Sequence, residues 1–211
     1  MGIKMYDAAG VLKTADIVGR SSFYSSNHIS GSGGLENWPV AGMINGTALT
    51  TASIVADTLY AMPFSSPRGG TIDQMTINVT TLGGSSSTRV GLYKSTRKGG
   101  NLYPGARITE AGTISTASTG VKTYTGGLPV TLDSDELYWF VCLCNTTAPI
   151  LRGLAVAGCY PIFGTSSVFG TAPGLGISVA FAFGTMPDPF TAGGAVITAA
   201  PIPAIACRYS A

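Results

Sequence analysis

Short stretches that alternate apolar and polar residues recur along this chain, and turns containing glycine or proline separate them. From Asp57 onward the stretches follow one another at regular spacing, and helical periodicity is nearly absent. This pattern favours a β-sandwich or barrel, because an alternation of period two turns one face of every strand toward a core. Gly supplies 29 and Pro 12 of the 211 residues, which suits the tight reversals of such a fold.

We expect strands over residues 57–64, 71–81, 87–95, 106–117, 120–125, 136–144, 150–157, 177–183 and 203–209. Turns are expected at residues 67–70, 82–85, 98–100 with 104–105, and 126–129. In the second strand Ile72, Met75, Ile77 and Val79 alternate, with one slip after Ile72. The alternating positions of the strongest strands predict a buried face made of Ile72, Ile77, Val79, Val90, Leu92, Tyr138, Phe140 and Cys142.

Residues 1–54 differ from the rest, and we predict an N-terminal attachment arm and linker there, followed by a sandwich domain over residues 55–211. Residues 21–34 are rich in Ser and Gly, as flexible linkers are. A small hairpin with a turn at residues 7–10 is expected before this linker, and a disordered terminus is the alternative. The candidate attachment residues are Ile3, Met5, Tyr6, Val11 and Leu12.

The charge and the apolar runs of the sequence exclude several classes of function. The chain has 12 Lys and Arg against 10 Asp and Glu, and charged residues make up 10% of it, where soluble domains usually have about 25%. The basic residues form no stripe, so nucleic acid is not an expected partner. No uninterrupted apolar run is long enough to span a membrane, and residues 1–10 lack the apolar core of a signal peptide. We therefore expect synthesis in a cytoplasm.

Catalytic and metal-binding patterns are weak in this sequence. His28 is the single histidine and lies in the Ser/Gly linker, which leaves a nucleophile no positioned base. The cysteines at positions 142, 144, 159 and 207 lack metal-site spacing, so we expect buried thiols. The acidic turn at residues 133–136 precedes an apolar strand, and calcium binding there is the alternative to a plain turn. We expect no enzyme activity, no metal and no cofactor.

Two candidate surfaces remain. The densest group of basic and aromatic residues suits an anionic glycan or a partner surface, and a solvated hairpin tip is the alternative. Its members are Tyr93, Lys94, Arg97, Lys98 and Tyr103. The second surface comes from residues 153–207, which carry one charged residue, Asp188, although Gly and Pro interrupt them repeatedly. Apolar side chains on such loops predict self-assembly, and loops that fold back to cap the sandwich are the alternative. The candidates for this assembly surface are Val168, Phe169, Leu175, Phe190, Val196 and Ile197.

The part of the chain from about Thr51 to Arg208 resembles the jelly-roll modules of tailed-bacteriophage virion proteins, namely tail-fibre or adsorption proteins and some head-decoration proteins. The resemblance covers about three quarters of the chain. The segments that carry it, in order, are residues 58–64, 71–81, 89–93, 104–105, 110–114, 137–140, 152–153 and the closing segment Phe183-Gly184-Thr185-Met186-Pro187-Asp188-Pro189-Phe190.

This resemblance implies an all-β, jelly-roll-like antiparallel β-sandwich with an N-terminal docking arm, in a protein of the virion that is not an enzyme. It also implies partners: sister chains in a homotrimer, other virion proteins, and a host surface glycan for a fibre. We expect a short tail fibre or adhesin. A capsid decoration protein is the alternative, because the sequence lacks the long repetitive shaft of elongated fibres. A glycan-processing enzyme is the remote alternative.

Overall fold

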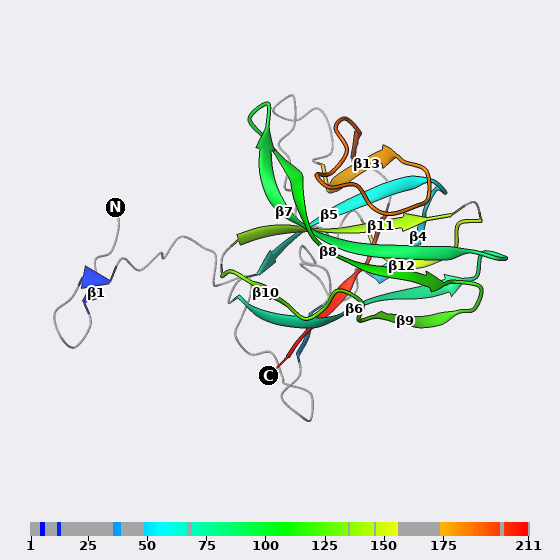
Figure 1. The fold of residues 1–211 in the computed structure, drawn as a ribbon, viewed down its shortest axis with the longest axis horizontal. Helices are drawn as coiled ribbons and strands as arrows, with labels where there is room; N and C mark the ends of the chain where they lie inside the picture. The colour runs from blue at the N-terminus through cyan, green and yellow to red at the C-terminus, as the bar shows by residue number, and fades with distance from the viewer. Residues whose placement is uncertain are drawn as a thin grey trace.

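The computed structural model describes residues 5–6, 12–13, 36–38, 49–66, 69–134, 136–145, 147–155, 174–198 and 201–210. Two antiparallel sheets form a β-sandwich, and the described residues contain no helix (Figure 1). No helix in this part of the chain is therefore long and apolar enough to cross a membrane. The expected all-β sandwich is confirmed, whereas jelly-roll connectivity in particular stays a prediction.

The first sheet has the order β15-β12-β6-β16-β3, with β4 paired to β12 and both β9 and β10 paired to β6. Its strands are β3 (Glu36–Trp38), β4 (Leu49–Ser53), β6 (Gly70–Thr81), β9 (Gly120–Tyr124), β10 (Val130–Leu132), β12 (Ile150–Leu154), β15 (Ile202–Pro203) and β16 (Ala206–Tyr209). The second sheet has the order β14-β13-β5-β11-β7-β8. It consists of β5 (Thr58–Ser66), β7 (Ser87–Lys98), β8 (Asn101–Ser115), β11 (Glu136–Cys144), β13 (Gly176–Ala180) and β14 (Ala195–Ile197).

The predicted core is confirmed, since all eight residues expected on the buried face are at most 2% exposed. They belong to the apolar cluster between the two sheets. The slip in alternation after Ile72 marks a β-bulge, where β6 pairs with β16 and the register shifts between Arg208 and Tyr209. An extra residue on one strand restores the inward direction of the next side chain, which explains the irregular spacing in the sequence.

Hydrogen bonds also join the two sheets. The Tyr124 hydroxyl on β9 donates to the Thr88 carbonyl on β7 at 3.2 Å, and Ser66 Oγ on β5 lies 2.8 Å from the Tyr209 hydroxyl on β16. Both tyrosines are buried, so these hydroxyls find partners inside the core. Burial raises the pKa of the Tyr124 hydroxyl above its ordinary value, which keeps it protonated as a donor.

The predicted domain boundary after residue 54 is placed too late in the chain. Strand β3 pairs with β16, and β4 pairs along its whole length with β12. Ala52 and Ile54 are buried, and Ile54 belongs to the core cluster. Residues 36–38 and 49–54 are therefore part of the sandwich. These short strands are hard to predict from the sequence, because they are stabilised by neighbours distant along the chain.

Candidate functional site

The candidate contact residues lie on the hairpin formed by β7 and β8, which rises beyond the sheet at the upper left of Figure 1. The register of β7 with β11 runs from Thr88 to Lys94, and beyond Lys94 β7 pairs with β8 alone. The predicted break at residues 104–105 is wrong, because β8 already begins at Asn101 and passes through Pro104 and Gly105 with shifts of register. We call residues 94–103 the basic hairpin.

The cations of the basic hairpin are exposed. Lys94, Arg97 and Lys98 all face solvent, and the ion pair that the described residues give them is between Lys94 Nζ and the Asp133 carboxylate, 3.8 Å apart. Arg97 donates to the Gly100 carbonyl at 3.0 Å, and Lys98 Nζ lies 5.3 Å from the centre of the Tyr103 ring. Within residues 87–109 there is no Asp or Glu at all, so the tip of the hairpin keeps its positive charge.

The two tyrosines of this predicted surface donate hydrogen bonds to backbone carbonyls of the chain itself. Tyr93 is completely buried, and its hydroxyl donates to the Pro187 carbonyl at 2.7 Å. Tyr103 is partly buried and donates to the Thr191 carbonyl at 2.7 Å. Burial raises the pKa of both hydroxyls, which keeps them protonated as donors. Tyr93 therefore offers no surface to a partner, contrary to the prediction, because a segment distant in sequence covers it.

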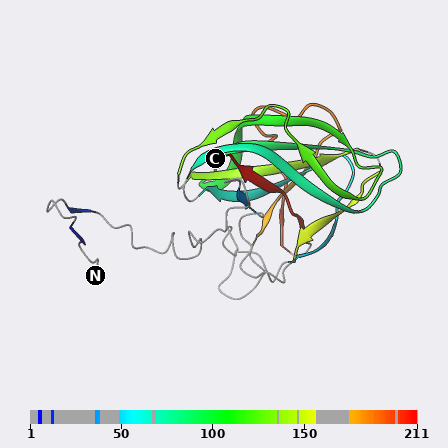
Figure 2. The same ribbon diagram turned by 90° about the horizontal axis from the view of Figure 1, so that it is seen from below.

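That covering segment, residues 181–194, we call the strap. It leaves β13, crosses the outer face of the second sheet, and returns to β14 (Figures 1 and 2). At its start Phe181 N donates to the Asp57 carbonyl and Phe183 N to Asp57 Oδ1, both at 2.8 Å. Further on, Phe190 N donates to the Gly105 carbonyl at 2.9 Å. The strap is thus fixed both at one end of the sandwich and at the base of the basic hairpin.

A second apolar cluster lies beneath the strap. Phe190 inserts edge-on between Tyr93 and Tyr103, with ring centroids 5.5 Å and 5.8 Å away. Met186 is also buried there, beside outward-facing residues of the sheet. The sheet residues in this cluster are Leu59, Ala61, Tyr93, Trp139, Val141, Leu143 and Ile177. Since strand β11 is apolar on both faces, the strap explains how its outer face is kept from water.

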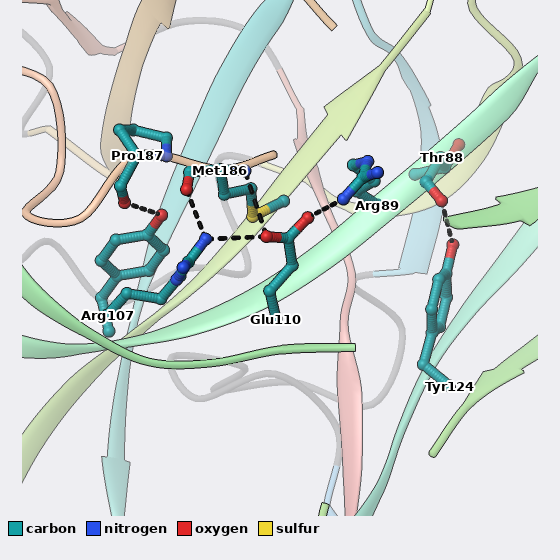
Figure 3. Close-up of polar contacts among 8 residues, drawn as sticks. Thr88, Arg89, Arg107, Glu110, Tyr124, Met186 and Pro187 are labelled. Carbon is teal, nitrogen blue, oxygen red and sulfur yellow. Dashed lines mark hydrogen bonds and ion pairs between the residues drawn. The ribbon is translucent and has the colours of Figure 1, made fainter. Parts of the chain in front are cut away.

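The centre of the strap is held by a carboxylate between two guanidinium groups (Figure 3). Glu110 on β8 pairs with Arg89 on β7, and its Oε2 lies 2.8 Å from Arg107 Nη1 and accepts from Met186 N at 3.1 Å. Arg107 also donates to the Met186 carbonyl, and its backbone N donates to Asp188 Oδ1 at 3.0 Å. This cluster was not predicted, because its members lie on two polar, charge-bearing strands and on a segment almost 80 residues further along the chain. Its contacts are those of a structural clamp.

The predicted assembly surface is divided by the structure. Leu175, Phe190 and Ile197 are buried within the chain's own two apolar clusters, so they are not available to another chain. For these three residues the prediction is wrong, because Ile197 lies in β14, Leu175 donates its backbone N–H to the Ile197 carbonyl, and Phe190 lies in the strap that covers the second sheet. Val196 is 49% exposed, as that prediction requires. Val168 and Phe169 lie outside the described residues.

The N-terminal hairpin is confirmed where it is described. Strand β1 (Met5–Tyr6) pairs antiparallel with β2 (Leu12–Lys13), with Met5 opposite Lys13 and Tyr6 opposite Leu12. Ile3, Val11 and the predicted linker at residues 21–34 lie outside the described residues, as does His28. The role of this hairpin in attachment stays a prediction.

The predicted buried thiols are confirmed for Cys142, Cys144 and Cys207, which are reduced and buried, while Cys159 lies outside the described residues. Burial raises the pKa of Cys144 to about 11 and that of Cys207 to about 12. Their thiolate forms are therefore disfavoured at neutral pH, and with them nucleophilic attack and metal ligation. Among the described residues, no group of three or more His, Cys, Asp or Glu is placed to hold a metal ion.

Comparisons with known proteins identify no relative: neither a protein-family model nor a curated protein matches this chain.

Proposed function

We propose that this chain is a non-enzymatic structural protein of a bacteriophage virion, in which it serves as a short tail fibre or adhesin that binds the host surface. The supporting observation is that the chain enters the sandwich at one end, while the loops at the opposite end are left for contact with the host. The chain enters the first sheet through β3, where Glu36 pairs with Tyr209 and Tyr209 with Ile72 near the start of β6. The opposite end of β6 carries loops that stay accessible when the N-terminal segment is attached to a particle.

The proposed partners are sister chains in a homotrimer, other virion proteins, and a host surface glycan. Capsid decoration is the second candidate function, because β3 begins at residue 36 and no shaft of repeats separates it from the N-terminal hairpin. Attachment through the N-terminal segment is common to both roles. They differ in the place on the particle and in whether the host is contacted.

Truncation tests the proposed attachment. Removing residues 1–35 keeps β3 and β4, so the sandwich should fold with an unchanged melting temperature while incorporation into particles is lost. Removing residues 1–54 is the matched control, because it also deletes Ala52 and Ile54 from the core and should destabilise the fold. Normal incorporation of the chain that starts at residue 36 would overturn the proposed role of the arm.

Imaging of labelled particles then separates the two roles. A label on the tail, together with poor adsorption to host cells by particles that lack the protein, would support the fibre or adhesin. A label spread over the head, with normal adsorption and weaker heads, would support decoration instead. If the protein were absent from purified wild-type particles, both roles would be overturned. If the purified chain degraded host polysaccharide, the result would favour an enzyme.

A further inference from the structure

The two ends of the sandwich have different chemistry, and the basic hairpin lies at the end where the N-terminal segment enters. We infer that the basic hairpin binds an acidic protein surface of the same particle to which the N-terminal segment attaches, and that the opposite end of the sandwich faces outward. The inference rests on the proposed function, since it takes residues 1–35 to be the attachment segment.

The strand register places the hairpin and the chain entry at one end. Glu36, Tyr209 and Ile72 lie level with one another across β3, β16 and β6, close to Gly70, where β6 begins. Strand β5 ends at Ser66, just before that point, and Ser66 pairs with Glu136 at the start of β11. Two residues further along β11, Tyr138 pairs with Lys94. From Lys94 the hairpin leaves the sheets at this end and rises at the upper left of Figure 1.

The opposite end is formed by connections that each pass from one sheet to the other. Residues 54–57 join β4 to β5, residues 82–86 join β6 to β7, residues 116–119 join β8 to β9, and residues 145–149 join β11 to β12. We call this the four-loop end, and it lies at the right of Figure 1. Asp57 is its single charged residue, and the Asp57 carboxylate already accepts a hydrogen bond from the strap.

The loops of the four-loop end are held together by their own hydrogen bonds. Ser86 Oγ lies 2.6 Å from Thr116 Oγ1, and Thr116 N donates to the Ser86 carbonyl at 2.9 Å. Asn145 Oδ1 accepts from Ser87 N at 2.9 Å. The loops of this end carry no exposed cation of their own, and the nearby Lys122 ammonium on β9 is held by Ser118 Oγ at 2.7 Å. Among the described residues, an acidic partner therefore meets one cation at this end, against Lys94, Arg97 and Lys98 at the hairpin.

The hairpin suits an acidic protein better than a sugar. Sugars bind to open aromatic faces, but Tyr93 is buried, and the Tyr103 ring already contacts Phe190 and has the Lys98 ammonium 5.3 Å from its centre. What the hairpin offers is the exposed cations Arg97 and Lys98, for which the described residues supply no carboxylate partner. Carboxylates on a neighbouring protein would complete these ion pairs, most strongly with the fork of an arginine.

The test compares two double variants that lower the net charge by the same two units at opposite ends. Arg97→Ser/Lys98→Ser removes the hairpin charges, whereas Ser85→Glu/Thr119→Glu adds acids at exposed positions of the four-loop end. All four positions are exposed, so equal melting temperatures should show that both variants fold. Each purified protein is titrated onto particles assembled without it, at low and at high salt.

We expect the hairpin variant to need about a tenfold higher concentration for half-maximal binding to particles at low salt, from two lost exposed ion pairs. Added salt should weaken binding of the unmodified protein toward the same level, and the four-loop variant should bind particles normally. Unchanged particle binding by the hairpin variant would overturn the inference. If that variant bound particles normally but those particles adsorbed poorly to host cells, the hairpin would be the host contact.

The same titration distinguishes a failure of the proposed attachment through residues 1–35 from a failure of the inference about the basic hairpin. If the unmodified protein does not bind particles at all, or binds equally well without residues 1–35, the proposed attachment fails before the hairpin is examined. If it binds through residues 1–35 and the two double variants behave alike, only the inference about the hairpin fails.

Discussion

Replacing Glu110 by Gln tests whether the carboxylate clamp holds the strap. The substitution keeps the size of the side chain but removes the negative charge between Arg89 and Arg107, so that an amide NH₂ group must face a guanidinium. Removing one partner of a buried ion pair typically costs about 3–5 kcal/mol. Glu110 is 9% exposed, but the two arginines are 22% and 24% exposed, so solvent screens part of the loss. We therefore expect the free energy of unfolding to fall by about 2 kcal/mol.

Urea denaturation followed by tryptophan fluorescence measures this loss, because Trp139 lies in the apolar cluster under the strap. Asp73→Asn is the matched control: it removes a carboxylate from a pair with Arg208 on the first sheet, away from the strap, where the two side chains are 26% and 29% exposed. The control should lose clearly less stability. If Glu110→Gln loses no more than Asp73→Asn, the carboxylate does not hold the strap and the reasoning is wrong.

Three further predictions concern the core, the thiols and assembly. Ile77→Ala should cost about 2–5 kcal/mol of unfolding free energy, and a denaturation loss well under 1 kcal/mol would contradict the burial of that face. Burial raises the pKa of the Cys144 thiol from 9.0 to about 11, so the stability that the buried thiol contributes is complete below pH 9 and is lost as the pH rises toward 11. Over that pH range the melting temperature of Cys144→Ala should fall less than that of the unmodified protein. Val196→Asp should weaken the proposed homotrimer without unfolding the chain, whereas Val121→Asp, at a 66% exposed position on the other sheet, should not. Light scattering measures this, and a stable monomer of the unmodified protein at micromolar concentration would contradict self-assembly.

The long strands, and the inward faces of β6, β7 and β11, could be predicted from the sequence. Alternation is a local property, so the stretch from Ile72 to Val79 revealed both its buried side and, through its one slip, the position of a β-bulge. Cys142 and Cys144, two residues apart on a strand, were likewise predicted to be buried thiols. The short strands β3, β4, β10 and β14 were missed, and β15 and β16 were predicted as one strand over residues 203–209. So few residues show little alternation, and they are stabilised by partners far along the chain.

The sequence does not reveal what covers the outer face of the second sheet or which residues stay exposed. Tyr93 lies in the densest basic and aromatic stretch of the sequence and was therefore predicted to contact a partner. In the structure it is covered by Pro187 and Phe190, which follow it by almost a hundred positions. The same strap buries Phe190, which the sequence placed on an assembly surface. The position of the basic hairpin at the end where Glu36 enters follows from the register across both sheets. Such contacts depend on how strands distant in sequence pair and stack, and a period-two pattern does not encode that.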